Sequence, residues 1–129
     1  MLFRSNDLYG HPIGDRVLRT LARLLRQRLR KSDGVGRYGG EEFGLVLPNA
    51  GVDDALRIFD EIRRAFGAIV QHAGDRTFSA TLSAGVAVIA GTDDGRMPDR
   101  LIADADAALY RAKRSGRDCV KVAERRKPR

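Results

Sequence analysis

The chain has 129 residues, of which 43% are hydrophobic and 32% charged, and its formal net charge at pH 7 is +7. This length and apolar content predict one globular domain over residues 1–129 and exclude a second domain. The single cysteine, Cys119, excludes an internal disulfide, and no apolar run is long enough to cross a bilayer. We therefore expect a soluble protein of the bacterial cytoplasm.

The basic excess predicts a phosphorylated partner, which could be nucleic acid, a nucleotide or anionic lipid. The basic residues gather on one expected helix and in a basic tail at residues 123–129. No helix-turn-helix, zinc or RNP pattern accompanies them. We expect no nucleic-acid contact and no membrane contact by this domain, and a nucleic-acid- or anionic-surface-binding domain is kept as an alternative.

Apolar residues at helical spacing predict an amphipathic helix over residues 15–31. Two short strands, 34–37 and 43–47, follow it, and Gly39-Gly40 between them suits the positive φ angles of a hairpin turn. A second helix is expected over residues 53–67, with the aspartate at its start as the cap.

Near-alternating apolar residues predict one long strand over 78–90, with a weak point at Gly85. A third helix is expected to begin at residue 98 or 99 and to end at Gly116, and a short strand over 119–122 follows. Helices and strands interleaved in this way predict a sheet with helices packed against it.

The most informative segment is the turn Arg37-Tyr38-Gly39-Gly40-Glu41-Glu42-Phe43. Carboxylates on a rigid turn can hold a divalent cation, and glycine lets the backbone approach a phosphate. The alternative is a solvated Gly-Gly hairpin with incidental acids, because turns are rich in both residue types. The turn by itself leaves both interpretations open.

Three blocks of the chain, in order, resemble the GGDEF domain family. They are Asn6-Asp7-Leu8-Tyr9-Gly10-His11-Pro12-Ile13-Gly14-Asp15, the turn segment 37–43 in its GGEEF form, and Ala107-Ala108-Leu109-Tyr110-Arg111-Ala112-Lys113-Arg114-Ser115-Gly116-Arg117. The resemblance implies a diguanylate cyclase, a signal-transducing transferase that condenses two GTP into cyclic di-GMP and releases pyrophosphate, using Mg²⁺ or alternatively Mn²⁺. It also implies an α+β fold whose central, mainly antiparallel sheet is flanked by helices, similar to the nucleotide cyclase and polymerase palm.

The resemblance assigns the signature turn to the metal and the phosphates. Glu41 would be a metal ligand and the candidate base for the ribose 3′-hydroxyl, and Glu42 a second ligand, with a solvent-facing strand residue as its alternative. Gly39 and Gly40 would contact the substrate. At the end of the third helix, the resemblance places residues 113 and 117 on the triphosphate. Without it, Lys113 and Arg117 would be ordinary cations at a helix C-terminus.

The resemblance assigns guanine recognition to residues near the start of the chain. Asn6 and Asp15 match guanine-reading positions, since a carboxylate can accept from guanine N1–H and N2–H while an amide both donates and accepts. His11 would complete the nucleotide pocket. The alternatives are a hydrogen-bonded turn residue for His11 and an acid favoured by the helix dipole for Asp15.

Arg30 and Asp33 form an Arg-x-x-Asp motif that matches the family's inhibitory product site, which implies allosteric inhibition by cyclic di-GMP. An arginine can fork a guanine edge or a phosphate, and an aspartate can accept from guanine. The family often adds a second arginine to this site. Ungapped counting places Glu61 at that position, and the nearby arginines are Arg57, Arg63 and Arg64.

The family begins with a strand ending in Asp-x-Asp, whose first aspartate binds magnesium, and only residues 1–5 precede Asn6 here. We therefore expect a domain that lacks its first strand, has little or no cyclase activity and still binds product through Arg30 and Asp33. A catalytically inactive cyclic di-GMP receptor domain is the first alternative. The expected partners are a second copy of the domain, since each copy supplies half of the site, and an upstream sensor or receiver domain.

Overall fold

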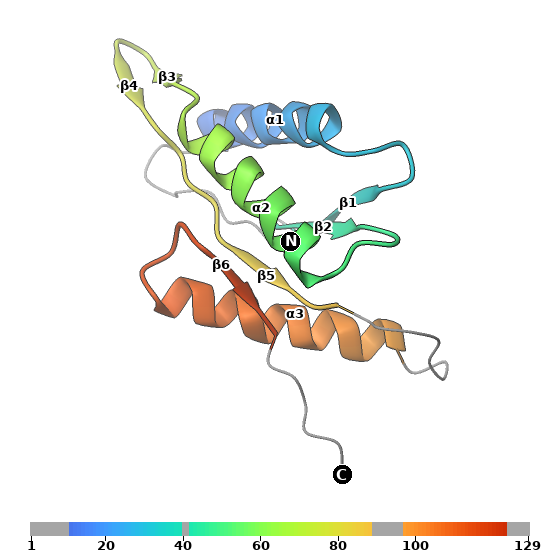
Figure 1. The fold of residues 1–129 in the computed structure, drawn as a ribbon. Coiled ribbons are helices and arrows are strands. Elements are labelled where there is room, and N and C mark those ends of the chain that lie inside the picture. The colour runs from blue at the N-terminus through green and yellow to red at the C-terminus, as the bar shows by residue number, and fades with distance from the viewer. Residues whose placement is uncertain (1–10, 40–41, 89–96, 124–129) are drawn as a thin grey trace.

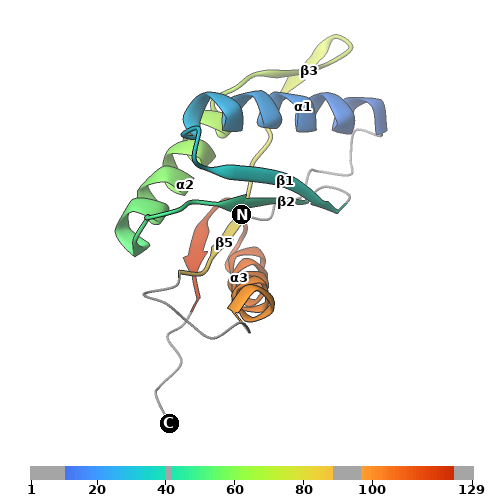
Figure 2. The same ribbon diagram turned by 90° about the vertical axis from the view of Figure 1, so that its right-hand side faces the viewer.

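The computed structural model describes residues 11–39, 42–88 and 97–123. The described elements, in chain order, are α1 (His11–Arg28), β1 (Gly34–Gly39), β2 (Glu42–Val46), α2 (Val52–Gly67), β3 (Gln71–Ala73), β4 (Arg76–Phe78), β5 (Ala84–Val86), α3 (Met97–Arg114) and β6 (Val120–Val122). Helices α2 and α3 cover opposite sides of the β5–β6 strands, and α1 packs beside α2 (Figures 1 and 2). The predicted α+β class is confirmed.

The described strands associate in pairs. β1 with β2 and β3 with β4 are antiparallel, while β5 and β6 are parallel and are joined through α3. A parallel pair needs such a crossover connection, because the chain must return to the end of the sheet at which it started. Helix α3 therefore covers the strand pair that it connects, and its last turn lies next to the start of β6.

The main core lies between α1, α2 and the strands. On α1 the buried residues recur at helical spacing, as the sequence predicts: Val17, Leu18, Leu21, Leu24 and Leu25. They pack with Phe43 of β2 and with Phe59, Ile62 and Phe66 of α2. Burying one large apolar side chain of this kind stabilises the fold by about 1.5–3 kcal/mol. None of the described helices is long and apolar enough to span a membrane.

The prediction of one long strand over 78–90 is wrong. The chain instead forms the separate hairpin β3–β4, which turns at Gly74 with φ 64°, and resumes pairing only at β5. The hairpin extends away from the rest of the fold in Figure 1. Alternating apolar residues identified the extended chain, but they carry no information on where its hydrogen-bond partners stop. Residues 89 and 90 lie outside the described part.

Gly85 is not a weak point, because it lies within β5 where α3 packs directly on the strand backbone. A Cβ atom at Gly85 would overlap the backbone of Ala105 and Leu109. On the facing side of α3, Ala108, Leu109 and Ala112 are buried. Glycine is required here by the close approach of the helix.

Several predicted boundaries shift by a few residues. α1 begins at His11 rather than at residue 15 and ends at Arg28 rather than at residue 31. The N-cap of α2 is Gly51, which has no side chain to form a capping bond. The prediction that Asp53 caps this helix is therefore wrong. Asp53 stands in the first turn, where the helix dipole favours an acid. α3 ends at Arg114, two residues before the predicted end at Gly116, and that glycine has the positive φ of 104° typical of a residue that terminates a helix.

Candidate functional site

The signature turn joins β1 to β2. Gly39 pairs with Glu42 and Arg37 with Phe43, so the register shifts by one residue at the end of this hairpin. Such a bulge redirects the side chains beside it. Glu42, the first residue of β2, is half-buried. The other predicted metal ligand, Glu41, and the substrate-contacting Gly40 lie outside the described residues.

Glu42 faces a cation from the far end of the chain. Its Oε1 lies 4.0 Å from Nζ of Lys113 in the last turn of α3, and the two side chains are 35% and 23% exposed. A pair at this separation adds little to stability. It does show that the signature hairpin and the third sequence block, which the sequence assigned to one nucleotide site, meet in the fold.

Arg117 follows the end of α3. Its backbone N–H donates to the carbonyl of Ala112 at 3.0 Å, and Gly116 before it has φ 104°. This pattern is a Schellman motif, in which the chain leaves the helix in a fixed direction. The Arg117 side chain is exposed and has no hydrogen-bond or ion-pair partner within the described part of the chain. It is free to bind an anion, although no contact joins it to Glu42 there.

Of the predicted guanine-reading residues, the structure describes the side chain of Asp15 alone. Asp15 is exposed, and it lies beyond the first turn of α1, which contains no acid in this structure. The alternative interpretation, an acid of the first turn favoured by the dipole, is therefore not the arrangement found. Asn6 lies outside the described residues, and His11 is described only as the first residue of α1.

Arg30 and Asp33 bind each other in the loop after α1. Nη2 of Arg30 donates to Oδ1 of Asp33 at 2.9 Å, and its backbone N–H donates to Oδ2 at 2.7 Å. The side chain of Asp33 is 1% exposed and that of Arg30 52%. The hydrogen bond from Arg30 lowers the pKa of Asp33 below its ordinary value, and the same bond raises the pKa of Arg30.

The pairing of Arg30 with Asp33 limits how the Arg-x-x-Asp motif could bind a guanine. The carboxylate of Asp33 is already occupied and closed to solvent, so it can accept from a guanine only after the pair opens. Arg30 keeps an exposed guanidinium, and its Nη2 also donates to the carbonyl of Pro48 at 2.8 Å. The Arg30 side chain is thereby held against the loop that leads into α2.

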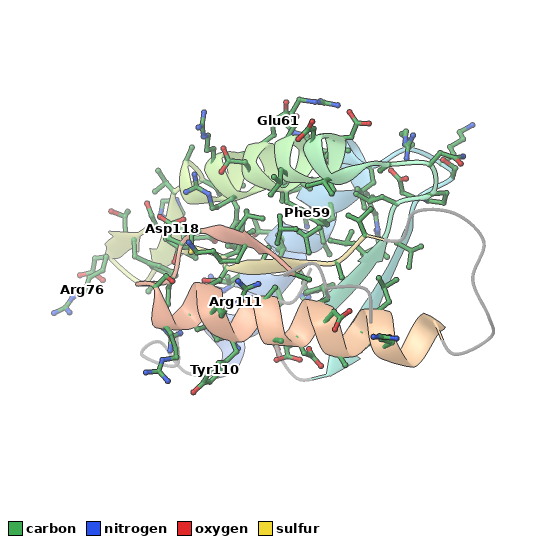
Figure 3. All side chains as sticks on the ribbon, turned by 60° about the horizontal axis from the view of Figure 1, so that its bottom comes forward. Phe59, Glu61, Arg76, Tyr110, Arg111 and Asp118 are labelled. Carbon is green, nitrogen blue, oxygen red and sulfur yellow. The ribbon has the colours of Figure 1, made fainter. Side chains whose placement is uncertain are left out.

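The arginines of α2 differ in their partners. Arg57 is 61% exposed and forms only long pairs, 3.8 Å to Asp54 and 3.6 Å to Glu61. Arg57 is therefore the least tightly paired of the three arginines of α2. Glu61 points outward from α2 (Figure 3).

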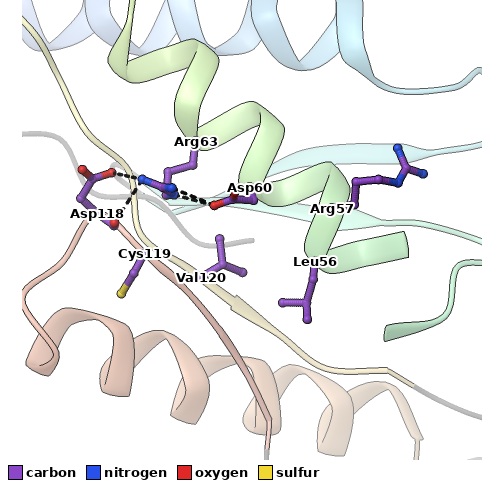
Figure 4. A pocket seen from close by; sticks show the side chains of 7 residues that line it. All are labelled: Leu56, Arg57, Asp60, Arg63, Asp118, Cys119 and Val120. Carbon is purple, nitrogen blue, oxygen red and sulfur yellow. Dashed lines mark hydrogen bonds and ion pairs between the residues drawn. The ribbon is translucent and has the colours of Figure 1, made fainter. Parts of the chain in front are cut away.

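Arg63 has a different role that the sequence did not reveal. It donates to Asp60 on its own helix and reaches Asp118 just before β6, at the edge of a hollow of about 470 Å³. Figure 4 shows these bonds, with Arg57 pointing away from them. The two partners Arg63 and Asp118 are far apart in the chain, and no local pattern could have paired them.

No group of three or more His, Cys, Asp or Glu that could hold a metal ion occurs within the described residues. The donor set is nevertheless compatible with magnesium. Mg²⁺ is commonly bound by one or two carboxylates together with substrate phosphates. Glu42, at the mouth of the hairpin, offers one such carboxylate beside the cation Lys113.

The model of the family described as "Diguanylate cyclase, GGDEF domain" matches residues 3–119. This chain therefore belongs to the GGDEF domain family. The diguanylate cyclase DgcP of Pseudomonas aeruginosa is 41% identical over 120 residues, which cover 93% of this chain and 17% of that protein. Among the curated relatives that match at 41–47% identity, the chain spans between 17% and 33% of each relative's length.

Solved GGDEF domains share the fold. The active GGEEF domain of a diguanylate cyclase from Vibrio cholerae aligns with a TM-score of 0.79 and 34% identity, covering 94% of this chain and 75% of that one. The GGDEF domain of DgcB from Caulobacter crescentus, solved in complex with c-di-GMP, aligns with a TM-score of 0.83 and 28% identity, covering 96% and 74%. Diguanylate cyclases of this family depend on a metal ion.

Proposed function

We propose that this chain is the catalytic GGDEF domain of a diguanylate cyclase, which condenses two GTP into cyclic di-GMP and two pyrophosphates. One observation carries the proposal. Glu42 of the signature hairpin lies 4.0 Å from Lys113 at the end of α3, so a carboxylate and a cation from distant parts of the chain converge. Phosphoryl transfer depends chiefly on positioning and on charge stabilisation, and a carboxylate and a cation on one side of the fold can supply both.

Each half of the reaction forms one phosphodiester bond. The 3′-oxygen of one GTP attacks the α-phosphorus of the other, the bond from that phosphorus to the bridging oxygen breaks, and pyrophosphate leaves. Glu41 is the candidate acceptor of the hydroxyl proton. Lys113 and Arg117 would bind the triphosphate oxygens and orient them. Arg117 suits this role because its exposed side chain has no partner in the described part of the chain.

Mg²⁺, or Mn²⁺ in its place, would be held by Glu41 and Glu42 together with phosphate oxygens. When bound, it neutralises the charge that develops on the phosphates. The guanine would be read by Asn6, His11 and Asp15. Asp15 supports this assignment, since its exposed carboxylate forms no hydrogen bond or ion pair within the described residues.

The product has two guanosine units, so two GTP-loaded domains must face each other, and we propose a homodimer as the working form. The chain spans a small share of its relatives' length, which is consistent with an upstream sensor or receiver domain in the parent protein. We also propose a cytoplasmic location, where GTP is supplied to the domain.

The function is tested by nucleotide binding and turnover. We expect GTP to bind more tightly than ATP in the presence of Mg²⁺, and slow formation of cyclic di-GMP to be detected by mass spectrometry. Glu41→Gln should abolish the product, while Glu61→Gln, an exposed change on α2, should leave its formation unchanged. Equal affinity for GTP and ATP, or product formation that survives Glu41→Gln, would contradict the proposal.

A second proposal concerns binding of cyclic di-GMP at Arg30 and Asp33. The exposed half of Arg30 supports an initial contact with a phosphate or a guanine edge. Opening of the pair would then free Asp33 to accept from guanine. Calorimetry should show binding that Arg30→Ala removes and that Arg28→Ala, an exposed change at the end of α1, retains.

A further inference from the structure

The backbone between α3 and β6 is strained. Gly116, Arg117 and Asp118 have φ angles of 104°, 63° and 46°. Glycine adopts such angles readily, but residues with a Cβ atom rarely do. Two consecutive non-glycine residues in this region persist only where their surroundings fix the conformation, and such positions concentrate at functional sites.

Asp118 is held through its backbone N–H, its carbonyl and one carboxylate oxygen. Its backbone N–H donates to Oγ of Ser83 at 3.1 Å, and Ser83 is itself buried. Its carbonyl and its carboxylate both accept from Nη1 of Arg63, at 3.4 Å and 3.0 Å. One guanidinium on α2 therefore holds both the backbone and the side chain of the strained residue.

Arg63 is in turn held in place by its own helix. Nε and Nη2 lie 2.9 Å and 2.8 Å from Oδ1 of Asp60, which leaves Nη1 directed at Asp118. The Arg63 side chain is 21% exposed. Figure 4 shows this arrangement as a bridge from α2 to the turn before β6.

We propose that Arg63 is a positioning residue for the nucleotide site: by holding Asp118, it fixes the strained turn that presents Arg117 to the triphosphate. This inference rests on the proposed function. Arg117 is held on one side by its bond to Ala112 and on the other by the fixed Asp118. Relaxation of the turn to ordinary angles would redirect its side chain.

The chain contains a matched control. Arg64, the next residue of α2, also pairs with Asp60, at 2.9 Å, but its side chain is 75% exposed and does not reach Asp118. Arg63→Gln and Arg64→Gln remove the same charge from the same helix. They differ in whether the bridge to Asp118 is lost.

The test measures the affinity for GTP and for guanosine by calorimetry. Guanosine has no phosphates, so it reports base recognition and folding without Arg117. We expect Arg63→Gln to weaken GTP binding about tenfold, the effect of losing one hydrogen bond to a charged group, and to change guanosine binding by less than about twofold. Arg64→Gln should change neither. Arg117→Ala should weaken GTP binding as Arg63→Gln does, and the double variant should be little weaker than either single variant.

Two variants of Asp118 separate positioning from general damage to the fold. Asn tolerates positive φ, and its amide oxygen can still accept from Arg63, so Asp118→Asn should retain GTP affinity. Asp118→Ala should behave as Arg63→Gln does. An unmodified chain that binds GTP no better than guanosine would overturn the proposed function together with this inference. GTP binding in which Arg63→Gln equals Arg64→Gln, equal loss of GTP and guanosine affinity, or fully additive losses with Arg117→Ala would overturn the inference alone.

Discussion

Lys113 and Glu42 face each other across 4.0 Å, although one lies in the last turn of α3 and the other is the first residue of β2. A partly exposed pair of this length adds less than about 1 kcal/mol to stability. Its importance is geometric, because a triphosphate with its cation needs an ammonium and a carboxylate on the same side of the fold. The pair therefore marks where the nucleotide phosphates are expected to bind.

Lys113→Ala should weaken GTP binding about tenfold, since it removes one charge-assisted hydrogen bond to phosphate. The thermal midpoint should change little, because the pair with Glu42 is partly exposed. Calorimetry and thermal unfolding measure the two effects. Arg114→Ala is the control: Arg114 stacks on Tyr110 at 5.7 Å and should leave GTP affinity unchanged. Equal losses in the two variants would remove Lys113 from the site.

Stability in acid should depend on Asp33. Its pKa is lowered in the folded protein by Arg30, so the unfolded chain binds a proton at higher pH than the folded chain. This stabilisation is complete above the ordinary pKa of about 3.9 and is lost as pH falls through the lower folded value. The free energy of unfolding can be measured with urea between pH 3 and 6 for the unmodified chain and for Asp33→Asn. The gap between the two free energies should shrink below about pH 4.

Arg30→Gln provides the control for this pH dependence. It removes the donor that lowers the pKa of Asp33, so in this background the acid-dependent effect of Asp33→Asn on stability should disappear. An effect that persists without Arg30 would show that another group controls the ionisation of Asp33.

Gly85→Ala should destabilise the fold severely, because its Cβ would overlap the backbone of Ala105 and Leu109. Overpacking in a core costs about 1–3 kcal/mol, and here the atoms in the way are backbone atoms that cannot rotate aside. Gly44→Ala, at a strand position where a Cβ meets nothing within 4 Å, should be neutral or slightly stabilising. Urea midpoints compare the two variants, and equal midpoints would contradict the close packing of α3 on β5.

Arg57→Ala should weaken binding of cyclic di-GMP by about five- to tenfold if this residue supplies the second product-site cation. The reason is that Arg57 is exposed and forms only long ion pairs, so it can turn toward an anion. Arg64→Ala should have little effect on this affinity, because Arg64 already forms a short ion pair with Asp60, 2.9 Å long. Calorimetry with cyclic di-GMP measures the affinity of both variants. Equal affinities in Arg57→Ala and Arg64→Ala would contradict the assignment of Arg57 to the product site.

The sequence predicted the elements whose signals are local. The apolar spacing of α1 and α2 identified both helices, and the paired glycines identified the hairpin that closes between Gly39 and Glu42. The sequence did not predict that the expected long strand over 78–90 is divided between β4 and β5. Strand limits depend on partners elsewhere in the chain, and β5 has only β6 beside it over three residues within the described part of the fold.

The candidate site was predicted to different degrees. Residue types and the family resemblance identified Lys113 and Glu42, which the structure brings together, and also Arg30 and Asp33. They did not reveal that Arg30 occupies the carboxylate of Asp33. That bond depends on the conformation of the loop after α1, where the N–H of Asp33 donates back to the carbonyl of Arg30.

The parallel pairing of β5 with β6 joins segments that are far apart in the chain, whereas β1 and β2 are adjacent in it. Lys113 and Arg117 lie between β5 and β6, on the connection that crosses back through α3. A nucleotide held between the signature hairpin and these two cations would therefore contact groups that only the folded domain brings together. Such a nucleotide should bind the native state in preference to the unfolded chain and so raise the stability of the whole fold.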